Sequence, residues 1–371
     1  MKIKTITCHE VYNHGASLQE HALLKFLINE GHEAKTLHYK PDYLSSHFKL
    51  DGLSNPKFDK PVIKQLYLLA KLPGRLKSLK RKKAFDDFAI KYIPTDHELY
   101  TSNEELKSNL PKADAYICGS DQIWNSFFQN GKDPAFYLDF VPDEKLKISY
   151  AASFAIDHIE DSLIDFVKEK VQRINCISVR ETSGVTILNS LGINSAVQVL
   201  DPVFLLDSIY WKNTFVNEKP NNDFVFVYDF DSNPLIEQLS KKIAKEQNLK
   251  IITVNKNINY SDYNYYLEGP EKFLSLMYYA KYVITNSFHS VAFSLIFEKQ
   301  FVVVNRTEAI NTRMRDLLGL FNLSSLLINS VEQFDAVNEI DYLKLNERKE
   351  ILKSFSKEFL LNALNNNILK H

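Results

Sequence analysis

The sequence predicts an α/β protein with two Rossmann-like domains. Apolar, β-branched segments alternate with helical segments along most of the chain, and 371 residues suffice for two full hydrophobic cores. A third observation is the polar stretch 210–223, which contains Pro220 and has the composition of a linker. We therefore expect a first domain over 1–209, a second over 210–345 and a C-terminal helix over 346–371 that packs back on the domains.

The first domain begins with a predicted βαβ unit. A strand over 2–9 precedes a helix over 17–30, Gly31 is the expected C-terminal cap of that helix, and a second strand follows over 33–40. Residues 41–112 are less regular. The further strands and helix expected in this domain are a strand at 115–119, one at 147–153, one at 176–182, a helix at 183–192 and a strand at 196–206 that turns at Asp201 and Pro202.

The pattern of the second domain is cleaner. Strands and helices alternate strictly there, as in a doubly wound parallel sheet. The expected elements are a strand at 224–230, a helix at 234–248, a strand at 250–255, a helix at 270–280, a strand at 282–286, a helix at 289–298 and a strand at 301–305. The last helix is expected over about residues 342–365.

The composition excludes several classes of function. A net charge of −1 and a pI of about 6.8 provide no global field for nucleic acid. Cys8, Cys118 and Cys176 lack the paired spacing of a disulfide framework or a zinc site, which favours a reducing cytoplasm. The N-terminus has no apolar signal core, and no apolar run reaches the roughly 20 residues that span a bilayer. We expect a cytoplasmic protein.

Three histidines near the N-terminus do not indicate a metal site. His9, His14 and His21 lie close together in the sequence, but their spacings do not place three ligands on one face of an element. No metal and no cofactor are therefore expected.

A basic run between Lys71 and Lys83 contains seven Lys and Arg residues. One interpretation is a solvated helix face. The other is a surface patch that contacts anionic lipid or acidic glycan, which would place the protein peripherally at the inner face of the membrane.

Turns at the carboxyl ends of predicted strands supply the candidate binding residues, because parallel sheets bind ligands at that edge. Asn13 and Gly15 lie in the first such turn. Asn286 and Ser287 lie between a buried strand and the helix that follows, where either side chain could cap the helix. His289 would then lie in the first helical turn, where free N–H groups favour an anion. A single histidine on an apolar helix is also compatible with a packing role.

Further candidates lie in "GSDQIWN" and "SVRET". Asp121 could take a proton from a substrate or cap the next helix, and Trp124 could stack on a sugar ring or fill the core. Gln122 and Asn125 are polar neighbours in the same turn. Arg180 could bind an anion as a planar fork or pair with the adjacent Glu181. Asp201, before Pro202, is expected to be a turn and capping residue.

Several stretches together resemble the polysaccharide pyruvyl transferase family. They are "NHGASLQ" at 13–19, "YICGSDQIWN" at 116–125, "SYAASF" at 149–154, "SVRETSG" at 178–184, "VLDPVFLL" at 199–206, "GPEKFLSLMYYAKYVITNSFHSVAFSLIFEKQFVVV" at 269–304 and "NTRMRDLL" at 311–318. The resemblance is weakest over about 41–110. It implies two Rossmann-type domains that face each other across a cleft, as in B-type glycosyltransferases. It also implies transfer of the pyruvyl group of phosphoenolpyruvate to two sugar hydroxyls as a cyclic ketal.

The resemblance assigns roles to the candidate residues. Phosphoenolpyruvate carries a phosphate and a carboxylate, so Arg180 in "SVRE" and Arg313 in "NTRMRDLL" would be its cationic forks. His289 in "NSFH" would be the general acid that protonates the enol methylene or the departing phosphate, and Asp121 a catalytic carboxylate. The acceptor would be a glycan or a lipid-linked glycan.

Two other functions compete with this one. A nucleotide-sugar-dependent glycosyltransferase of the same fold usually has an acidic pair with a Gly-Pro turn beside the helix equivalent to the one after His289. Here only Glu298 is present, and "EKQF" has no Gly-Pro turn. The other alternative is a non-catalytic glycan-binding protein, and the presence of Arg180 and His289 argues against it.

Overall fold

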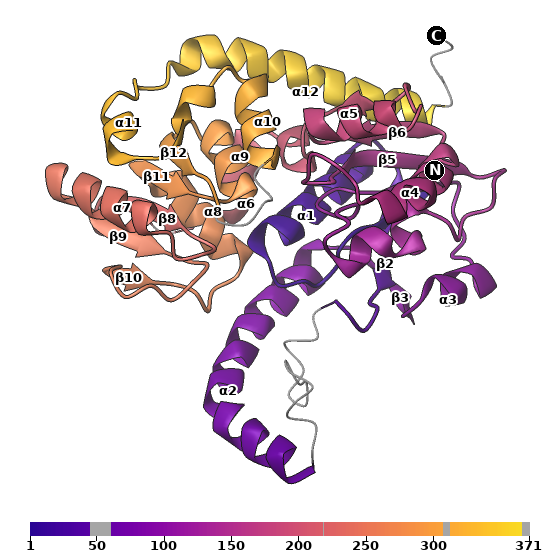
Figure 1. The fold of residues 1–371 in the computed structure, drawn as a ribbon, viewed down its shortest axis with the longest axis horizontal. Coiled ribbons are helices and arrows are strands. Elements are labelled where there is room, and N and C mark those ends of the chain that lie inside the picture. The colour runs from indigo at the N-terminus through magenta and orange to yellow at the C-terminus, as the bar shows by residue number, and fades with distance from the viewer. Residues whose placement is uncertain (45–60, 218, 307–311, 366–371) are drawn as a thin grey trace.

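The computed structural model describes residues 1–44, 61–217, 219–306 and 312–365. These residues form two parallel β-sheets, each flanked by helices, that lie side by side with the long helix α12 (Tyr342–Leu364) running across both (Figure 1). Both halves therefore have the predicted α/β architecture.

The first sheet has seven strands in the order β3-β2-β1-β4-β5-β6-β7. Its pairs are all parallel, and the central strands are buried, as expected for apolar strands covered on both faces. The strands are β1 (Lys2–Ile6), β2 (Glu33–Tyr39), β3 (Thr95–Tyr100), β4 (Ala115–Cys118), β5 (Leu146–Ala152), β6 (Cys176–Val179) and β7 (Val197–Gln198).

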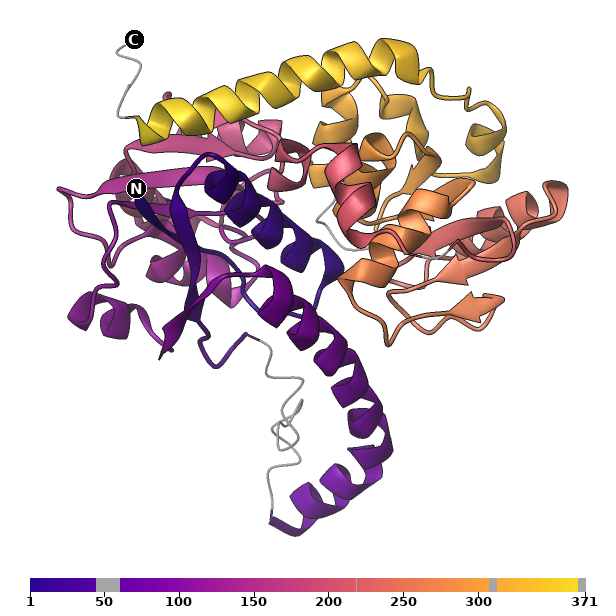
Figure 2. The ribbon, with the colours of Figure 1, turned by 180° about the vertical axis from the view of Figure 1, so that it is seen from behind.

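Helices and 3₁₀ turns connect these strands. The α-helices are α1 (His14–Asn29), α2 (Pro61–Tyr92), α3 (Asn103–Ser108), α4 (Ile164–Gln172) and α5 (Thr182–Ser190). The 3₁₀ helices are η3 (Gln129–Lys132), η4 (Pro134–Tyr137), η5 (Asp161–Leu163) and η6 (Pro202–Leu205). The lower part of α2 extends away from both sheets (Figures 1 and 2).

The second sheet has six parallel strands in the order β10-β9-β8-β11-β12-β13. The strands are β8 (Phe224–Tyr228), β9 (Lys250–Thr253), β10 (Tyr263–Asn264), β11 (Tyr282–Thr285), β12 (Gln300–Val304) and β13 (Leu327–Ile328). The accompanying helices are α6 (Ser208–Phe215), α7 (Pro234–Glu246), α8 (Pro270–Tyr279), α9 (Phe288–Ile296), α10 (Thr312–Leu320), η7 (Ser324–Leu326) and α11 (Val331–Asp335).

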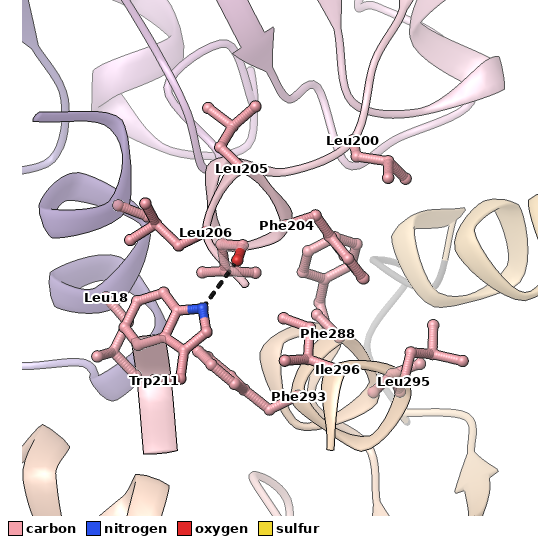
Figure 3. Packing of buried hydrophobic residues seen from close by; sticks show 14 of the residues in the cluster. Leu18, Leu200, Phe204, Leu205, Leu206, Trp211, Phe288, Phe293, Leu295 and Ile296 are labelled. Atoms are coloured by element: carbon pink, nitrogen blue, oxygen red, sulfur yellow. Dashed lines mark hydrogen bonds between the residues drawn. The ribbon is translucent and has the colours of Figure 1, made fainter. Parts of the chain in front are cut away.

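A continuous hydrophobic core joins the two halves. Leu18 of α1 and Phe204 of η6 belong to the same buried cluster as Phe293 of α9 (Figure 3). Trp211 of α6 is fully buried there, and its indole N–H donates to the carbonyl oxygen of Val203 at 3.1 Å. Full burial of a large apolar side chain stabilises a fold by about 1.5–3 kcal/mol. This shared apolar packing therefore helps to fix the two halves relative to each other.

Helix α12 adds polar links across the halves. The Ser356 hydroxyl accepts from the backbone N–H of Leu200 at 2.9 Å, and Lys353 forms an ion pair with Asp207. Near its start, the Tyr342 hydroxyl donates to the carbonyl oxygen of Lys299 in the second half. Figure 2 shows the same helix from behind, spanning both halves.

Some predicted elements differ from the structure. The predicted linker 210–223 overlaps helix α6, because Trp211 and Phe215 anchor this segment in the core. The predicted strand at 196–206 is a strand only over Val197–Gln198. Pro202 provides no N–H for a ladder, and the chain turns into η6 there. The strand β3 and the helices α2 and α3 lie in the region 41–112, where the sequence pattern was less regular and indicated only a helix around 71–83, as one interpretation of the basic run.

Candidate functional site

His289 lies in the first turn of α9, directly after the carboxyl end of β11, as the sequence predicted. Its side chain is 7% exposed, and its Nε2 lies 3.5 Å from Asp201 Oδ2. That distance suits an ion pair when the ring carries two protons, but Nε2 makes no hydrogen bond. A buried polar atom without a partner is costly, so His289 is not a satisfied packing residue.

The first turn of α1 closes one side of His289. A Cβ atom added to Gly15 would lie 1.9 Å from His289 Nδ1, so only glycine admits the imidazole at this place. Asn13 is the N-cap of α1, and its Oδ1 accepts from the backbone N–H groups of Gly15 at 2.9 Å and Ala16 at 3.2 Å. Asn13, predicted as a binding residue, thus caps α1, and Gly15, predicted likewise, leaves the space that the imidazole occupies.

Asp201 is the centre of the charged groups. Its Oδ1 accepts from the backbone N–H of Val203 at 3.1 Å, which confirms the predicted capping role. Its Oδ2 accepts from Arg180 Nη1 at 2.7 Å and faces His289. Burial raises the pKa of Asp201, but His289 and Arg180 outweigh it and hold the pKa well below its usual range. Asp201 is therefore an ionised carboxylate around which the site is ordered.

Arg180 is surrounded by carboxylates. Besides Asp201, its Nε donates to Glu181 Oε1 at 3.1 Å, and its Nη2 lies 3.5 Å from Asp121 Oδ1. The guanidinium also lies over the Phe288 ring, 4.1 Å from the ring centroid. Burial opposes the charge of Arg180, but the three carboxylates outweigh it and raise its pKa. The ion-pair interpretation of Arg180 therefore agrees with the structure, and each of its three nitrogen atoms already faces a carboxylate.

Arg313 contrasts with Arg180. It is 5% exposed, and within the part of the chain that the structure describes its Nε has no hydrogen-bond partner and its one carboxylate contact is Asp121 Oδ1 at 3.8 Å. Burial, with Arg180 and Arg306 nearby, lowers the pKa of Arg313 to about 9. A buried cation with so little compensation favours an added anion.

Asp121 lies between the two arginines, at long contact distances from both. Its backbone has a left-handed conformation with φ of 64°, which is uncommon outside glycine. Burial raises the pKa of Asp121, but Arg180, His289 and Arg313 outweigh it and lower the pKa. Its carboxylate thus lies where a ligand anion could also contact both guanidinium groups.

The other residues of the "GSDQIWN" turn support this arrangement in different ways. With its amide oxygen facing donors, Gln122 accepts from Arg313 Nη1 at 3.1 Å and Nη2 at 3.3 Å. Asn125 is buried, and its Oδ1 accepts from the backbone N–H of Phe127. Its role is therefore to order the turn.

Trp124 is not placed to bind a sugar. It is fully buried, its indole N–H donates to the carbonyl oxygen of Phe136 at 3.0 Å, and its ring stacks on Tyr137. A ring with no exposed face cannot stack on a substrate, so the prediction of Trp124 as a binding residue is wrong. Its alternative interpretation as a core residue is confirmed.

Asn286 and Ser287 do not cap α9 with their side chains, contrary to the prediction. Asn286 instead accepts from the backbone N–H of Phe230 at 2.9 Å and donates to Asp229 and Asp231. Its amide is thus committed to the loop after β8. Among the described residues, the first N–H groups of α9 have no side-chain acceptor, and an anion could accept from them.

Sequence reasoning underestimated two carboxylates. Asp201 was expected only to cap a turn, and Glu181 only to pair with Arg180, yet both lie at the centre of the site. Burial raises the pKa of Glu181 despite the adjacent Arg180, and its Oε2 has no hydrogen-bond partner. Their positions beside β6 and β7 were the available signal, because the carboxyl ends of neighbouring parallel strands meet at one edge.

The basic run 71–83 lies within α2, and its residues do not form one free patch. Arg81 donates to the carbonyl oxygens of Val254 and Tyr266 in the second half. Lys82 and Lys83 form ion pairs with acidic residues one turn further along the helix. The side chains of Lys71 and Arg75 lie outside the described residues, and membrane contact through this run stays a prediction.

The parallel sheets and the charged site between them define a two-domain α/β protein of the architecture found in B-type glycosyltransferases. Residues 13–308 match the family model described as polysaccharide pyruvyl transferase. The chain belongs to this family. A search of curated proteins finds no significant match.

Solved structures with a similar fold have low sequence identity. MnaA of S. aureus, in a co-structure with UDP, is 13% identical, with 100% of this chain and 98% of MnaA covered and a TM-score of 0.51. A Listeria monocytogenes protein described as a UDP-N-acetylglucosamine 2-epimerase is 10% identical, with 100% and 97% covered and a TM-score of 0.50. These similarities concern the fold alone. Among the described residues, none of the helices is long and apolar enough to cross a membrane.

Proposed function

We propose that the protein transfers the pyruvyl group of phosphoenolpyruvate to two hydroxyls of one sugar, in a polysaccharide or its precursor, and forms a cyclic pyruvate ketal. Family membership supports the transferase class. The donor, the ketal and the glycan acceptor are our proposals.

One observation carries the choice of an anionic donor. Among the described residues, two nitrogen atoms in the connected group around Asp201 and Asp121 are buried without a hydrogen-bond partner: His289 Nε2 and Arg313 Nε. Buried polar atoms in native proteins nearly always have partners, so such a group is expected where a ligand completes the bonds. Phosphoenolpyruvate has acceptor oxygens for both nitrogen atoms.

The charges of the site also limit how the donor binds. Arg180 and Arg313 contribute +2, and Asp121, Asp201 and Glu181 contribute −3 when all are ionised, so the sum is −1 with a neutral His289. With all three carboxylates ionised, an anion would bind more favourably if it displaced one of them. Asp121 is the one with the longest contacts, at 3.5 and 3.8 Å. We infer that the donor carboxylate or phosphate replaces Asp121 beside Arg313.

The reaction requires an alternation of acid and base. The enol methylene gains a proton and becomes a methyl group, while one sugar hydroxyl attacks the adjacent carbon and loses its proton. The carbon–oxygen bond to phosphate then breaks, and a second hydroxyl attacks the same carbon and closes the ketal. Inorganic phosphate leaves with the second proton, so the two hydroxyl protons balance the two that are taken up.

His289 is the proposed acid and Asp121 the proposed base. The Nε2 of His289 has no hydrogen bond to protein and faces the ionised Asp201, which would stabilise the imidazolium before it gives up its proton. Asp121, once displaced from Arg313, would be an ionised carboxylate beside the acceptor hydroxyl. Asp201 positions His289 and Arg180 rather than contacting the substrate.

A nucleotide-sugar donor has less support from the site. Glu298, the carboxylate that would have to bind a ribose, accepts from Asn346 at 2.9 Å and lies 3.8 Å from Lys349, both on α12. It is thus committed to helix packing. For the acceptor, we propose a glycan made in the cytoplasm, either free or attached to lipid.

The decisive experiment is incubation with phosphoenolpyruvate and a panel of oligosaccharide and sugar–lipid acceptors, followed by mass spectrometry. A product heavier by one pyruvyl group, with release of phosphate, is the expected result. Thermal shift separates the alternatives beforehand, because a ligand that binds only the native state stabilises it by about 2.7 kcal/mol at 100 times its Kd. Stabilisation by UDP-sugars but not by phosphoenolpyruvate would point to the glycosyltransferase instead, and stabilisation by glycans alone to a binding protein.

A further inference from the structure

A second group of ionisable side chains lies at the carboxyl edge of the first sheet, outside the proposed donor site. His9 and Glu10 follow β1, and His38 lies near the end of the neighbouring strand β2. One ligand atom from each of the three lies within 4.8 Å of the others. The chain thus gathers two imidazoles and a carboxylate at one place.

The geometry points to a site for a divalent transition metal, and we propose that His9, Glu10 and His38 bind Zn²⁺. Two histidines and one glutamate form one of the ligand sets of zinc enzymes. Nitrogen and mixed ligands favour Zn²⁺ and its neighbours in the first transition row, whereas Mg²⁺ and Ca²⁺ prefer oxygen ligands alone. The proposal does not depend on the proposed pyruvyl transfer.

A second carboxylate orients His9 for this role. Glu20 of α1 is buried, and its Oε1 accepts from His9 Nδ1 at 2.9 Å. With the proton held on Nδ1, the lone pair of Nε2 is free for a metal. Nε2 is also the nitrogen that faces Glu10, at 3.6 Å from its Oε1. A carboxylate behind a metal-binding histidine is the usual support of zinc ligands.

The spacing of the atoms is close to that of a metal site. Ligand atoms around a tetrahedral Zn²⁺ lie about 3.4 Å apart, given metal–ligand distances near 2.1 Å. His9 Nε2 and Glu10 Oε1 lie 3.6 Å apart, which is close to this spacing. All three ligand atoms lie within 4.8 Å of one another, so a spacing of about 3.4 Å requires shifts of at most roughly 1.4 Å, which side-chain rotation can provide. The His38 ring is half-buried and meets the His9 ring edge to face, with centroids 5.7 Å apart.

The local charge favours a cation. Counting only the ion pairs among the described residues, Glu10 and Glu20 contribute −2 and Lys40 contributes +1, so these three side chains sum to −1. Lys40 binds Glu10 through Oε2, and the Oε1 atom faces His9. Lys40 is thus a competitor for the carboxylate but does not occupy the metal position.

The backbone of this segment has the strain often found at binding sites. Glu10 and Tyr12 both have left-handed conformations, with φ of 53° and 54°. The register between β2 and β3 shifts between Thr36 and His38, and such irregularities re-aim side chains. A metal here would tie the loop before α1 to β2, and so hold Gly15 against His289.

The test uses the full chain after removal of metals by a chelator. Calorimetric titration with Zn²⁺ should give one tight site per chain, and titration with Mg²⁺ should give none. Co²⁺ in its place should produce the visible absorption of a low-symmetry site with nitrogen ligands. Cys8→Ser should bind Zn²⁺ as well as the wild type, because the adjacent thiol is not one of the proposed ligands.

Matched variants identify the ligands. His38→Gln should lose the site, and His158→Gln, the same change at an exposed histidine outside the group, should keep it. Glu20→Gln should weaken binding by about 10–100-fold, the usual effect of losing support behind a ligand. Lys40→Gln should bind Zn²⁺ at least as tightly as the wild type, since a competing cation is removed.

Either of two results would overturn the proposal: no Zn²⁺ bound by the wild type, or equal binding by wild type and His38→Gln. His38 is half-buried, so its replacement by Gln is the variant least expected to impair folding, and a thermal melt without metal checks this. Binding of phosphoenolpyruvate to the metal-free chain is measured separately, so failure of one proposal leaves the other intact.

Discussion

The two sheet edges that meet at the site differ in how their charges are compensated. On the side of the first sheet, Arg180 contacts three carboxylates, and Asp201 has a partner for each oxygen. On the side of the second sheet, His289 and Arg313 each have a buried nitrogen without a hydrogen bond. The ion pairs on the first side are therefore more complete, although Glu181 Oε2 has no hydrogen-bond partner among the described residues, and the cationic groups on the second side are less fully paired.

This difference separates structural from ligand-binding groups. A buried charge whose partners are all present contributes to the order of the fold, and removal of one partner leaves the others uncompensated. A buried charge with few partners lowers stability and is retained where a ligand completes it. Arg180 and Asp201, with their ion pairs, are therefore the structural groups, which we call the frame of the site. His289 and Arg313 are the groups expected to contact the donor.

The largest expected effect is on the frame. Arg180→Ala should lower the free energy of unfolding by about 3–5 kcal/mol, because three carboxylates lose their common cation in a buried place. Urea denaturation measures this. Lys83→Ala is the control, since its ion pair with Asp87 is mostly exposed and should contribute at most about 1 kcal/mol. A stable Arg180→Ala variant that loses only donor binding would instead support the predicted role of Arg180 in binding the donor anion.

The next effect concerns the acid. His289→Gln keeps a hydrogen-bonding side chain of similar size but cannot transfer a proton near neutral pH, so turnover should fall about 100-fold or more. Donor affinity, measured by calorimetry, should change little. The exposed His158→Gln variant should match the wild type in both. Normal turnover by His289→Gln, or loss of all donor binding by a folded variant, would exclude the imidazole as the acid.

A smaller effect is expected for the incompletely paired arginine. Arg313→Gln should weaken phosphoenolpyruvate binding by about 1.5–3 kcal/mol, the range for hydrogen bonds to charged groups, while the free energy of unfolding stays the same or rises. Arg315→Gln, two positions along the same helix, should bind the donor normally. If Arg313→Gln instead destabilises the fold and binds the donor like the wild type, Arg313 has a structural role and does not contact the donor.

The sequence predicted most of this arrangement and missed specific parts for physical reasons. Alternating apolar segments and strand-end turns indicated the parallel sheets and the positions of His289 and Arg180. Glu181 was predicted as a partner of Arg180, but Asp201 could not be, because it reaches Arg180 only through the pairing of β6 and β7. Likewise, His9 and His38 lie far apart in the sequence, and only the pairing of β1 and β2 brings them together.

The smallest expected effect is a pH dependence of the frame. The folded-state pKa of Asp201 is depressed, so its ionisation contributes stability that is fully present above the unfolded value of about 3.9 and is lost as the pH falls toward the folded value. The melting temperature of the wild type should therefore drop steeply below about pH 4. Asp201→Asn keeps an oxygen for the turn but has no charge to lose, so its melting temperature, though lower at pH 7, should change less between pH 5 and pH 3. Parallel slopes for both proteins would show that Asp201 is not the carboxylate that orders the site, and would leave His289 without its proposed counter-ion.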